Sequence, residues 1–278
     1  MMEWLASKRA VIIPGVMKGG TCSMRAQLQA LEKPLRLSLP TQEPHFFDND
    51  EEFALGVSHY ASWFDRNCEM IGDVTPSYMY LPKALLRLRQ YLPQAKLIVL
   101  LRNPIGRAVS HHNHDLSKCR KVGSLEERWT REMLQAAAEP SRSDAFRRGF
   151  YSEQLERILQ HYPKEQVLVL ISERCRQDPI QHLKLVANFL GLQEVPWLSP
   201  HIFAEQHVRK WYWEEPSQHL REKLQHFYGR EVQRLRGLLG DALPEWDNDF
   251  RLPSVVPQHP WLLTTVAAPR GFEAPLQT

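Results

Sequence analysis

A short segment near the start of the chain combines residue types that bind a phosphate-like anion. Residues 11–23 read VIIPGVMKGGTCS, an apolar run followed by Lys18, Gly19, Gly20 and Thr21. Glycines between a strand and a helix let backbone N–H groups approach an anion at the helix N-terminus. The loop of nucleoside triphosphatases places its lysine after the glycines, in the pattern GxxxxGK[ST]. Because Lys18 precedes them, that pattern is not met.

A second candidate follows the apolar run KLIVLL of residues 96–101. A magnesium-dependent phosphoryl-transfer enzyme has an aspartate at the end of such a strand to hold the metal. This chain has Arg102 there, and the planar guanidinium group of an arginine binds phosphate rather than a cation. The hydroxyl of Ser110 follows on the predicted helix. We therefore expect a ligand with two separate anionic groups, one at the end of each strand.

The elements that position these residues alternate between strands and helices. Continuous apolar runs predict strands, and apolar residues at helical spacing predict helices. The predicted strands are 10–14, 96–101 and 166–171, and the predicted helices are 21–31, one beginning at 104, 151–162, 178–191 and 219–240. This order favours the α/β class, with a P-loop-like parallel central sheet that is flanked by helices on both faces. We expect a single domain over residues 1–250 and an irregular, proline-rich tail over residues 251–278.

Composition bounds the classes of function. The chain has 278 residues, 43% of them hydrophobic and 24% charged, with a net charge of +3. This describes an ordinary globular protein whose charge is too small to indicate a nucleic-acid partner. Four cysteines are scattered without a CxxC pair, and no apolar run reaches the about 18–20 residues that would cross a membrane. Because the apolar run near residue 11 is very short, we also expect no secretory leader. We expect a cytoplasmic protein with free thiols and no membrane partner.

Two segments together resemble a known family. PGVMKGGTCS and LRNPIGRAVSHH are similar to the two phosphosulfate-binding segments of sulfotransferases that use 3′-phosphoadenosine 5′-phosphosulfate (PAPS). The branch with the heparan sulfate sulfotransferases and their bacterial relatives is the most similar. QEPHFFDND resembles its acceptor-side motif, GDVTPSY a third motif, and RGFYSEQLERILQHYPKEQVLVLISE a fourth. The resemblance extends from about residue 10 to about residue 246 and implies PAPS as co-substrate, with adenosine 3′,5′-bisphosphate as product.

The resemblance also implies which residues bind the nucleotide. Those for the 5′-phosphosulfate are Lys18, Gly19, Gly20, Thr21 and Cys22, and those for the 3′-phosphate are Arg102 and Ser110. Tyr151 is placed to contact the adenosine. Arg209 and Lys210, in the run HVRKWYW, match a basic loop that closes over the 3′-phosphate. Lys18 neutralises charge on the leaving phosphate, so that no metal is required.

The acceptor must lose a proton as it attacks, which needs a base close to the glycine loop. Glu43 in QEPHFF matches the glutamate that takes this proton in the family, and His45 either assists it or orients it. Without the resemblance, EPHFF would be interpreted as a buried strand edge. The third motif departs from the heparan sulfate pattern, because Asp73 and Val74 stand where those enzymes have an acidic residue and a lysine. Asp73, Thr75 and Ser77 remain candidates to line the acceptor cleft.

A histidine cluster, HHNHD over residues 111–115, raises the question of a metal site. His111 and His114 share a helix face, but no nearby cysteine pair or carboxylate set completes a site, so none is expected. The three histidines are expected near the cofactor or acceptor mouth.

The sequence thus predicts a sulfotransferase that acts in line on a hydroxyl, or less readily an amine, of a small metabolite or saccharide. Two alternatives stay open at this point. One is an atypical P-loop kinase and the other a non-catalytic nucleotide-binding protein. The acceptor and the oligomeric state are not determined by the sequence.

Overall fold

The centre of the molecule is a parallel sheet. The computed structural model describes residues 2–135, 140–141, 144–192 and 213–250. Within these residues, the strands form one five-stranded sheet in the order β2-β3-β1-β4-β5, and every neighbouring pair is parallel. The strands are β1 (Arg9–Gly15), β2 (Leu37–Ser38), β3 (Met70–Val74), β4 (Lys96–Leu101) and β5 (Val167–Ile171). The predicted parallel α/β architecture is confirmed.

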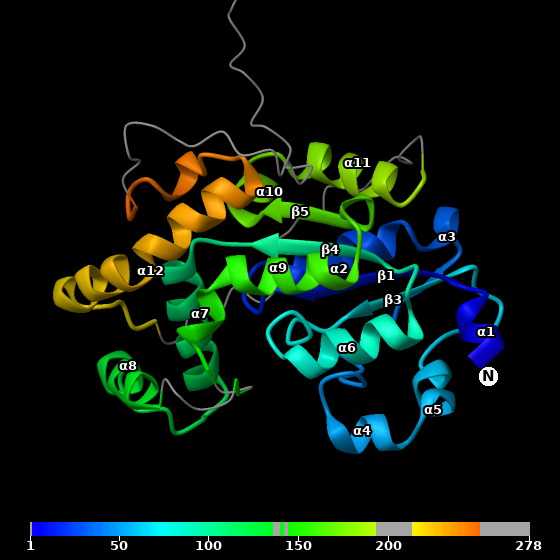
Figure 1. Cartoon of the computed structure of the whole chain (residues 1–278), viewed down its shortest axis with the longest axis horizontal. Helices are drawn as coiled ribbons and strands as arrows, with labels where there is room; N and C mark the ends of the chain where they lie inside the picture. The colour runs from blue at the N-terminus through cyan, green and yellow to red at the C-terminus, as the bar shows by residue number, and fades with distance from the viewer. Residues whose placement is uncertain (1, 136–139, 142–143, 193–212, 251–278) are drawn as a thin grey trace, which may run out of the picture.

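Helices connect the strands and cover both faces of the sheet (Figure 1). Before β4 they are α1 (Met2–Ala6), α2 (Thr21–Ala30), α3 (Glu32–Leu35), α4 (Asp50–Ala54), α5 (Val57–Ser62) and α6 (Pro82–Tyr91). After β4 they are α7 (Pro104–Ser117), α8 (Leu125–Leu134), α9 (Tyr151–His161), α10 (Ser172–Gln177), α11 (Pro179–Phe189) and α12 (Gln218–Leu239). The helices predicted from periodicity are α2, α7, α9, α11 and α12, and all of them form.

Apolar residues bury both faces of the sheet. Along β4, Leu97, Val99 and Leu101 pack into one hydrophobic cluster with residues of α6, α9 and α12. Ile98 and Leu100 point to the opposite face and join a second cluster with residues of α2 and α11. Because successive strand residues alternate between faces, burial on both sides requires a run that is apolar throughout. This is the physical reason for the KLIVLL pattern.

The parallel strands bring their carboxyl ends to one edge. β1 ends at Gly15, β4 at Leu101 and β5 at Ile171, and α2, α7 and α10 begin just beyond these ends. In Figure 1 the start of α7 and the end of α12 lie at this edge. Open parallel sheets bind ligands outside the carboxyl ends of their strands. The two predicted anion-binding segments therefore lie where such a fold places its site.

The described helices include none that is both long enough and apolar enough to pass through a membrane. Residues 251–278 lie outside the described residues, so the division into a domain over 1–250 and a tail stays a prediction.

Candidate functional site

The loop between β1 and α2 is wound tightly against β4. The N–H of Val16 donates to the carbonyl oxygen of Leu100 (2.9 Å), and the N–H of Gly19 donates to the carbonyl oxygen of Val16 (2.8 Å). A Cβ on Gly19 would lie 2.7 Å from the Leu100 oxygen and 2.9 Å from the Val16 oxygen, so only glycine fits. Gly20 caps α2 in the left-handed region, with φ of 98°. The loop thus ends at a helix N-terminus whose first N–H groups can bind an anion.

Arg102 meets this loop from the end of β4. Its Nη1 donates to the carbonyl oxygen of Lys18, at 3.1 Å. A Cβ on Gly106 would lie 3.8 Å from both Nε and Nη2 of Arg102, so the guanidinium group lies over this glycine on α7. Ser110 is four residues further along, on the same helix face. The structure therefore joins Arg102 to the glycine loop and puts Ser110 on the helix face that Arg102 covers.

Arg107 is a functional candidate that the sequence analysis missed. It is completely buried, its Nη1 lies 3.4 Å from the carbonyl oxygen of Met17, and its Nη2 donates to the carbonyl oxygen of Ala145. Two arginines from the segment after β4 therefore contact the backbone of the same loop. In the sequence RNPIGRAVS, Arg107 is visible only as a second arginine five residues after the first.

The predicted base belongs to a line of ionisable side chains. Oε2 of Glu43 lies 3.2 Å from Nε2 of His45, and Nδ1 of His45 lies 3.2 Å from both carboxylate oxygens of Asp48. The hydroxyl of Ser77 donates to Asp48. Asp48 is 3% exposed, whereas the Glu43 side chain is 37% exposed. Sequence reasoning missed Asp48, although it lies three residues after His45 in the same motif.

His45 carries a positive charge at neutral pH. Burial alone would lower its pKa, but hydrogen bonds and charges from Asp48 and Glu43 overcome this and raise the pKa of His45 to about 9. The backbone of His45 is in the left-handed region, with φ of 52°, which is unusual for a residue other than glycine. An imidazole that is already protonated cannot accept a second proton. Because His45 lies between the carboxylates of Glu43 and Asp48, it is placed to orient the Glu43 carboxylate.

The segment around Glu43 is not a strand. Residues 43–45 form no regular structure and lead into a turn, while Phe46 and Phe47 are fully buried. Phe46 stacks on Tyr60 with a centroid separation of 4.8 Å. The alternative interpretation of EPHFF as a buried strand edge is therefore wrong, because the two phenylalanines anchor an irregular segment instead.

Cys22 lies within electrostatic reach of both catalytic candidates. Burial and the negative charge of Glu43 raise the pKa of the Cys22 thiol, and the positive charge of Lys18 acts in the opposite direction. The first turn of α2 therefore lies near Lys18 and Glu43 together. Lys18 itself has φ of 69°, so the lysine and the histidine of the candidate site both have left-handed backbones.

Asp73 and Thr75 do not line a cleft. Both are 0% exposed. Asp73 accepts hydrogen bonds from the hydroxyls of Thr75 (2.6 Å), Tyr60 (3.1 Å) and Tyr78 (3.0 Å). Burial raises the pKa of Asp73 to about 6, although these three donors act to lower it. The expectation that Asp73 and Thr75 line the acceptor cleft is wrong, because they form a polar network inside the core.

A positive charge lies beside Val74 despite the absence of a lysine there. Arg25 of α2 donates from Nη2 to the carbonyl oxygen of Val74 (2.8 Å) and from Nη1 to that of Pro40 (2.7 Å). Its charge also influences Cys22. Arg25 therefore supplies a cation beside the backbone of Val74, the position where the resemblance implied a lysine.

Tyr151 has a contact that differs from the predicted one. It is 1% exposed, and its hydroxyl donates to the carbonyl oxygen of Arg102 at 2.8 Å. The contact in the structure therefore supports the position of Arg102, and contact with the adenosine stays a prediction. Arg209 and Lys210 lie outside the described residues, so their predicted role also stays a prediction.

Two histidines of the cluster, His111 and His112, are buried inside the protein, whereas His114 is partly exposed. Nε2 of His111 lies 3.5 Å from Asp115, and Nε2 of His112 lies 2.9 Å from Oε2 of Glu214. Burial and the charge of Arg107 hold the pKa of His111 well below its usual value, so it is neutral. Among the described residues there is no group of three His, Cys, Asp or Glu side chains that could hold a metal ion.

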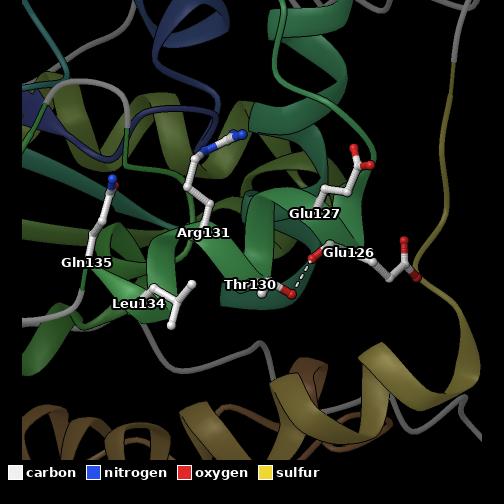
Figure 2. A pocket seen from close by; sticks show the side chains of 6 residues that line it. All are labelled: Glu126, Glu127, Thr130, Arg131, Leu134 and Gln135. Carbon is white, nitrogen blue, oxygen red and sulfur yellow. Dashed lines mark hydrogen bonds between the residues drawn. The ribbon is translucent and has the colours of Figure 1, made fainter.

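A hollow on α8 is separate from the residues discussed above. Figure 2 shows its lining, in which the hydroxyl of Thr130 donates to the carbonyl oxygen of Glu126 at 3.0 Å. Leu134 is 84% exposed there. The described residues that line this hollow are Glu126, Glu127, Thr130, Arg131, Leu134 and Gln135, and none of them is a predicted site residue.

Comparisons with known proteins identify the family of the chain. The model of the "Sulfotransferase domain" family matches residues 8–234. Heparan sulfate glucosamine 3-O-sulfotransferase 3A1 of Mus musculus is 35% identical over 186 residues, which are 66% of this chain and 46% of that protein. Heparan sulfate glucosamine 3-O-sulfotransferase 5 of Homo sapiens is 30% identical over 192 residues, 66% of this chain and 53% of that protein. The chain spans about half the length of the curated relatives it matches.

A solved structure supports the same assignment over more of the chain. The crystal structure of a sulfotransferase from Alicyclobacillus acidocaldarius superposes with a TM-score of 0.70 and 25% identity. The match covers 86% of this chain and 98% of that one. With the family model matched from the first strand into α12, the chain belongs to the sulfotransferase family.

Proposed function

We propose that the chain is a sulfotransferase that transfers the sulfuryl group of PAPS to a hydroxyl group, or less readily an amine, of a small metabolite or saccharide. The observation that carries the proposal is the approach of two groups of residues. The charges of Lys18 and Glu43 both act on Cys22 in the first turn of α2, and Arg25 of the same helix donates to the carbonyl oxygen of Pro40 (2.7 Å), three residues before Glu43. The residues proposed to hold the donor and those proposed to activate the acceptor therefore both approach the start of α2.

The residues fit a nucleotide with two anionic groups. The N–H groups at the start of α2 and the ammonium group of Lys18 are donors for the 5′-phosphosulfate. The loop has the close packing at Gly19 that such a cradle requires. Arg102, which lies over Gly106 on the face of Ser110, provides donors for the 3′-phosphate. Tyr151, Arg209 and Lys210 complete this proposed set.

In the proposed reaction, the hydroxyl oxygen of the acceptor attacks the sulfur atom of PAPS in line with the leaving phosphate. Glu43 accepts the proton that this hydroxyl loses. A positioned general base contributes a rate factor of about 10²–10⁴. His45 holds the Glu43 carboxylate in place, and Asp48 holds His45. Lys18 stabilises the negative charge that develops on the leaving phosphate, which is electrostatic catalysis without a metal ion.

The relatives named above are described as acting on heparan sulfate glucosamine, and a saccharide hydroxyl is therefore one supported acceptor class. The chain has Val74 where the heparan sulfate pattern described above has a lysine. Arg25, which donates to the carbonyl oxygen of Val74, is the cation at this place. We infer that the acceptor is a small metabolite or a saccharide that offers a hydroxyl group or, less readily, an amine.

The proposal is tested by mass spectrometry and a labelled donor. The protein is incubated with PAPS labelled in the sulfo group and with a panel of hydroxylated metabolites, amines and oligosaccharides, and a product with one added sulfo group is expected. Glu43→Gln and Lys18→Ala are each expected to lower turnover at least about 100-fold. A non-catalytic nucleotide-binding protein would bind adenosine 3′,5′-bisphosphate without any product. The family match disfavours the kinase alternative, which predicts that ATP and Mg²⁺ bind and that adenosine 3′,5′-bisphosphate does not.

A further inference from the structure

Arg176 lies on α10, the helix that begins where β5 ends. Its Nη1 donates to the hydroxyl oxygen of Ser172 at 3.3 Å. The same Ser172 oxygen lies 3.4 Å from the place where Gly20 would carry a Cβ. The guanidinium group of Arg176 therefore binds a serine that lies next to the N-terminus of α2, where the predicted anion cradle is.

A second link joins Arg176 to the segment of Arg102. Oε1 of Glu173 accepts a hydrogen bond from the N–H of Asn103 at 3.1 Å and lies 3.7 Å from Nη2 of Arg176. Asn103 is the residue directly after Arg102. Ser172 and Glu173 thus connect Arg176 to the start of α2 and to the residue that follows Arg102.

The two arginines affect each other electrostatically. Burial lowers the pKa of Arg102, and the positive charge of Arg176 is the next largest cause in the same direction, ahead of the opposing charge of Glu173. The carboxylate of Glu173 offsets only part of the repulsion between the two like charges, because its effect on Arg102 is smaller than that of Arg176, and a further anion between them would offset the rest. Such a pair on two different elements is an arrangement that a phosphate group, with its two negative charges, would stabilise.

We propose that Arg176 is a binding residue for the 3′-phosphate of the nucleotide, which it shares with Arg102. The inference rests on the proposed function, because that function assigns the 3′-phosphate to Arg102 and Ser110. It adds a side chain from a third strand end, that of β5, to a site that the sequence assigned to the ends of β1 and β4. Arg176 then contributes to the preference for a nucleotide with a 3′-phosphate over one without it.

The test compares two nucleotides by isothermal titration calorimetry. Adenosine 3′,5′-bisphosphate and 5′-AMP are titrated into the wild-type chain, Arg176→Ala and Arg176→Gln. A charge-assisted hydrogen bond is worth about 1.5–3 kcal/mol, so the two variants are expected to bind the bisphosphate about 10–100-fold more weakly. The affinity for 5′-AMP is expected to stay within about 2-fold, because 5′-AMP lacks the 3′-phosphate.

Arg234→Ala is the matched control, since it also removes one arginine but from the half-exposed surface of α12, where Arg234 pairs with Glu156. It is expected to bind both nucleotides like the wild type. The inference is overturned if the wild type binds the bisphosphate but the Arg176 variants lose affinity for both nucleotides equally. It is also overturned if these variants lose affinity for neither nucleotide. Failure of the wild type to bind the bisphosphate overturns the proposed function itself, and the assignment of Arg176 with it.

Discussion

Both carboxylate oxygens of the buried Asp48 lie 3.2 Å from Nδ1 of His45. This contact fixes the imidazole ring, whose Nε2 faces Glu43 at 3.2 Å on the other side. Because each ring nitrogen meets a carboxylate, the protonated imidazole is the favoured form. His45 therefore acts as a rigid cationic bridge between a buried carboxylate and a partly exposed one, and the exposed one is left as the proton acceptor.

Replacement of Asp48 tests whether this bridge positions the base. In Asp48→Asn the carboxamide keeps the size of the side chain but removes the charge that holds the imidazolium. We expect kcat to fall about 10–100-fold, because a misplaced general base loses part of a factor of about 10²–10⁴, and KM for the nucleotide to stay within about 2-fold. The NMR titration of His45 should at the same time move to a lower pKa.

Asp50→Asn is the control for this experiment. Asp50 belongs to the same segment but is 67% exposed and pairs with Lys83 and Arg87 at the surface. It should leave kcat and the His45 titration unchanged. If Asp48→Asn had wild-type kcat, Asp48 would have no part in the position of Glu43.

The charge on His45 predicts a dependence of stability on pH. The folded-state pKa of about 9 is above the value of about 6.5 for an unperturbed histidine, so the folded chain binds this proton more tightly than the unfolded chain does. The contribution is fully present below about pH 6.5 and is lost as the pH rises through about 9. Since the side chain is 35% exposed, we expect a loss of only about 1 kcal/mol. Urea unfolding at pH 6.5, 8 and 9.5 measures this loss in the free energy of unfolding. In His45→Gln, the free energy of unfolding should lack this part of its pH dependence.

Two glycines allow a matched pair of substitutions. In Gly19→Ala the new methyl group would meet two backbone oxygens at 2.7 and 2.9 Å, which cannot move aside as a side chain can. We expect a loss of about 1–3 kcal/mol in the free energy of unfolding, together with weaker binding of adenosine 3′,5′-bisphosphate. The experiment pairs urea unfolding with calorimetry.

Gly237 lies within α12, and nothing is within 4 Å of the place of its Cβ. Gly237→Ala should therefore stabilise the chain by about 0.4–1 kcal/mol and leave nucleotide binding unchanged. If Gly19→Ala bound the nucleotide as tightly as Gly237→Ala, the loop would not be the anion cradle that we describe.

The sequence predicted the strands that are apolar throughout and the helices with clear periodicity. A strand buried on both faces and a helix buried on one face each produce a recognisable pattern of apolar residues. It did not predict β3, whose sequence MIGDV includes a glycine and an aspartate. A Cβ on Gly72 would lie 2.7 Å from a methyl carbon of Leu39, directly after β2, and 3.1 Å from one of Leu37 in β2, so a larger residue would crowd these two leucines. Asp73 is accommodated by tyrosines that are 5 and 13 residues away in the chain. Such partners are evident only when the fold is known.

The same reasoning applies to the candidate site. Lys18, Arg102 and Glu43 were predicted because each belongs to a segment that resembles a known motif. Asp48 and Arg107 were missed because their roles depend on contacts with His45 and with the carbonyl oxygen of Met17, which no spacing rule encodes. The left-handed backbones of Lys18 and His45 are likewise imposed by the surrounding structure.

The buried carboxyl of Asp73 leads to a prediction in another pH window. Its folded-state pKa of about 6 lies above the ordinary value of about 3.9, so between these values the folded chain holds a proton that the unfolded chain has lost. Stability from this group therefore falls as the pH rises from about 4 to about 6, by up to about 3 kcal/mol.

Asp73→Asn cannot titrate, so the difference in unfolding free energy between the wild type and the variant should change over this window. Most other carboxylates give a slope of the opposite sign, which is why the difference, and not the wild-type curve, is the quantity to measure. The variant should also be less stable at pH 4, because the amide nitrogen replaces an oxygen that accepts from the hydroxyls of Tyr60 and Tyr78. Tyr60→Phe removes one of these donors and should raise the pKa of Asp73 further, which would move the window to higher pH. A difference that does not change between pH 4 and 6.5 would mean that Asp73 is ionised in the folded core at all these pH values.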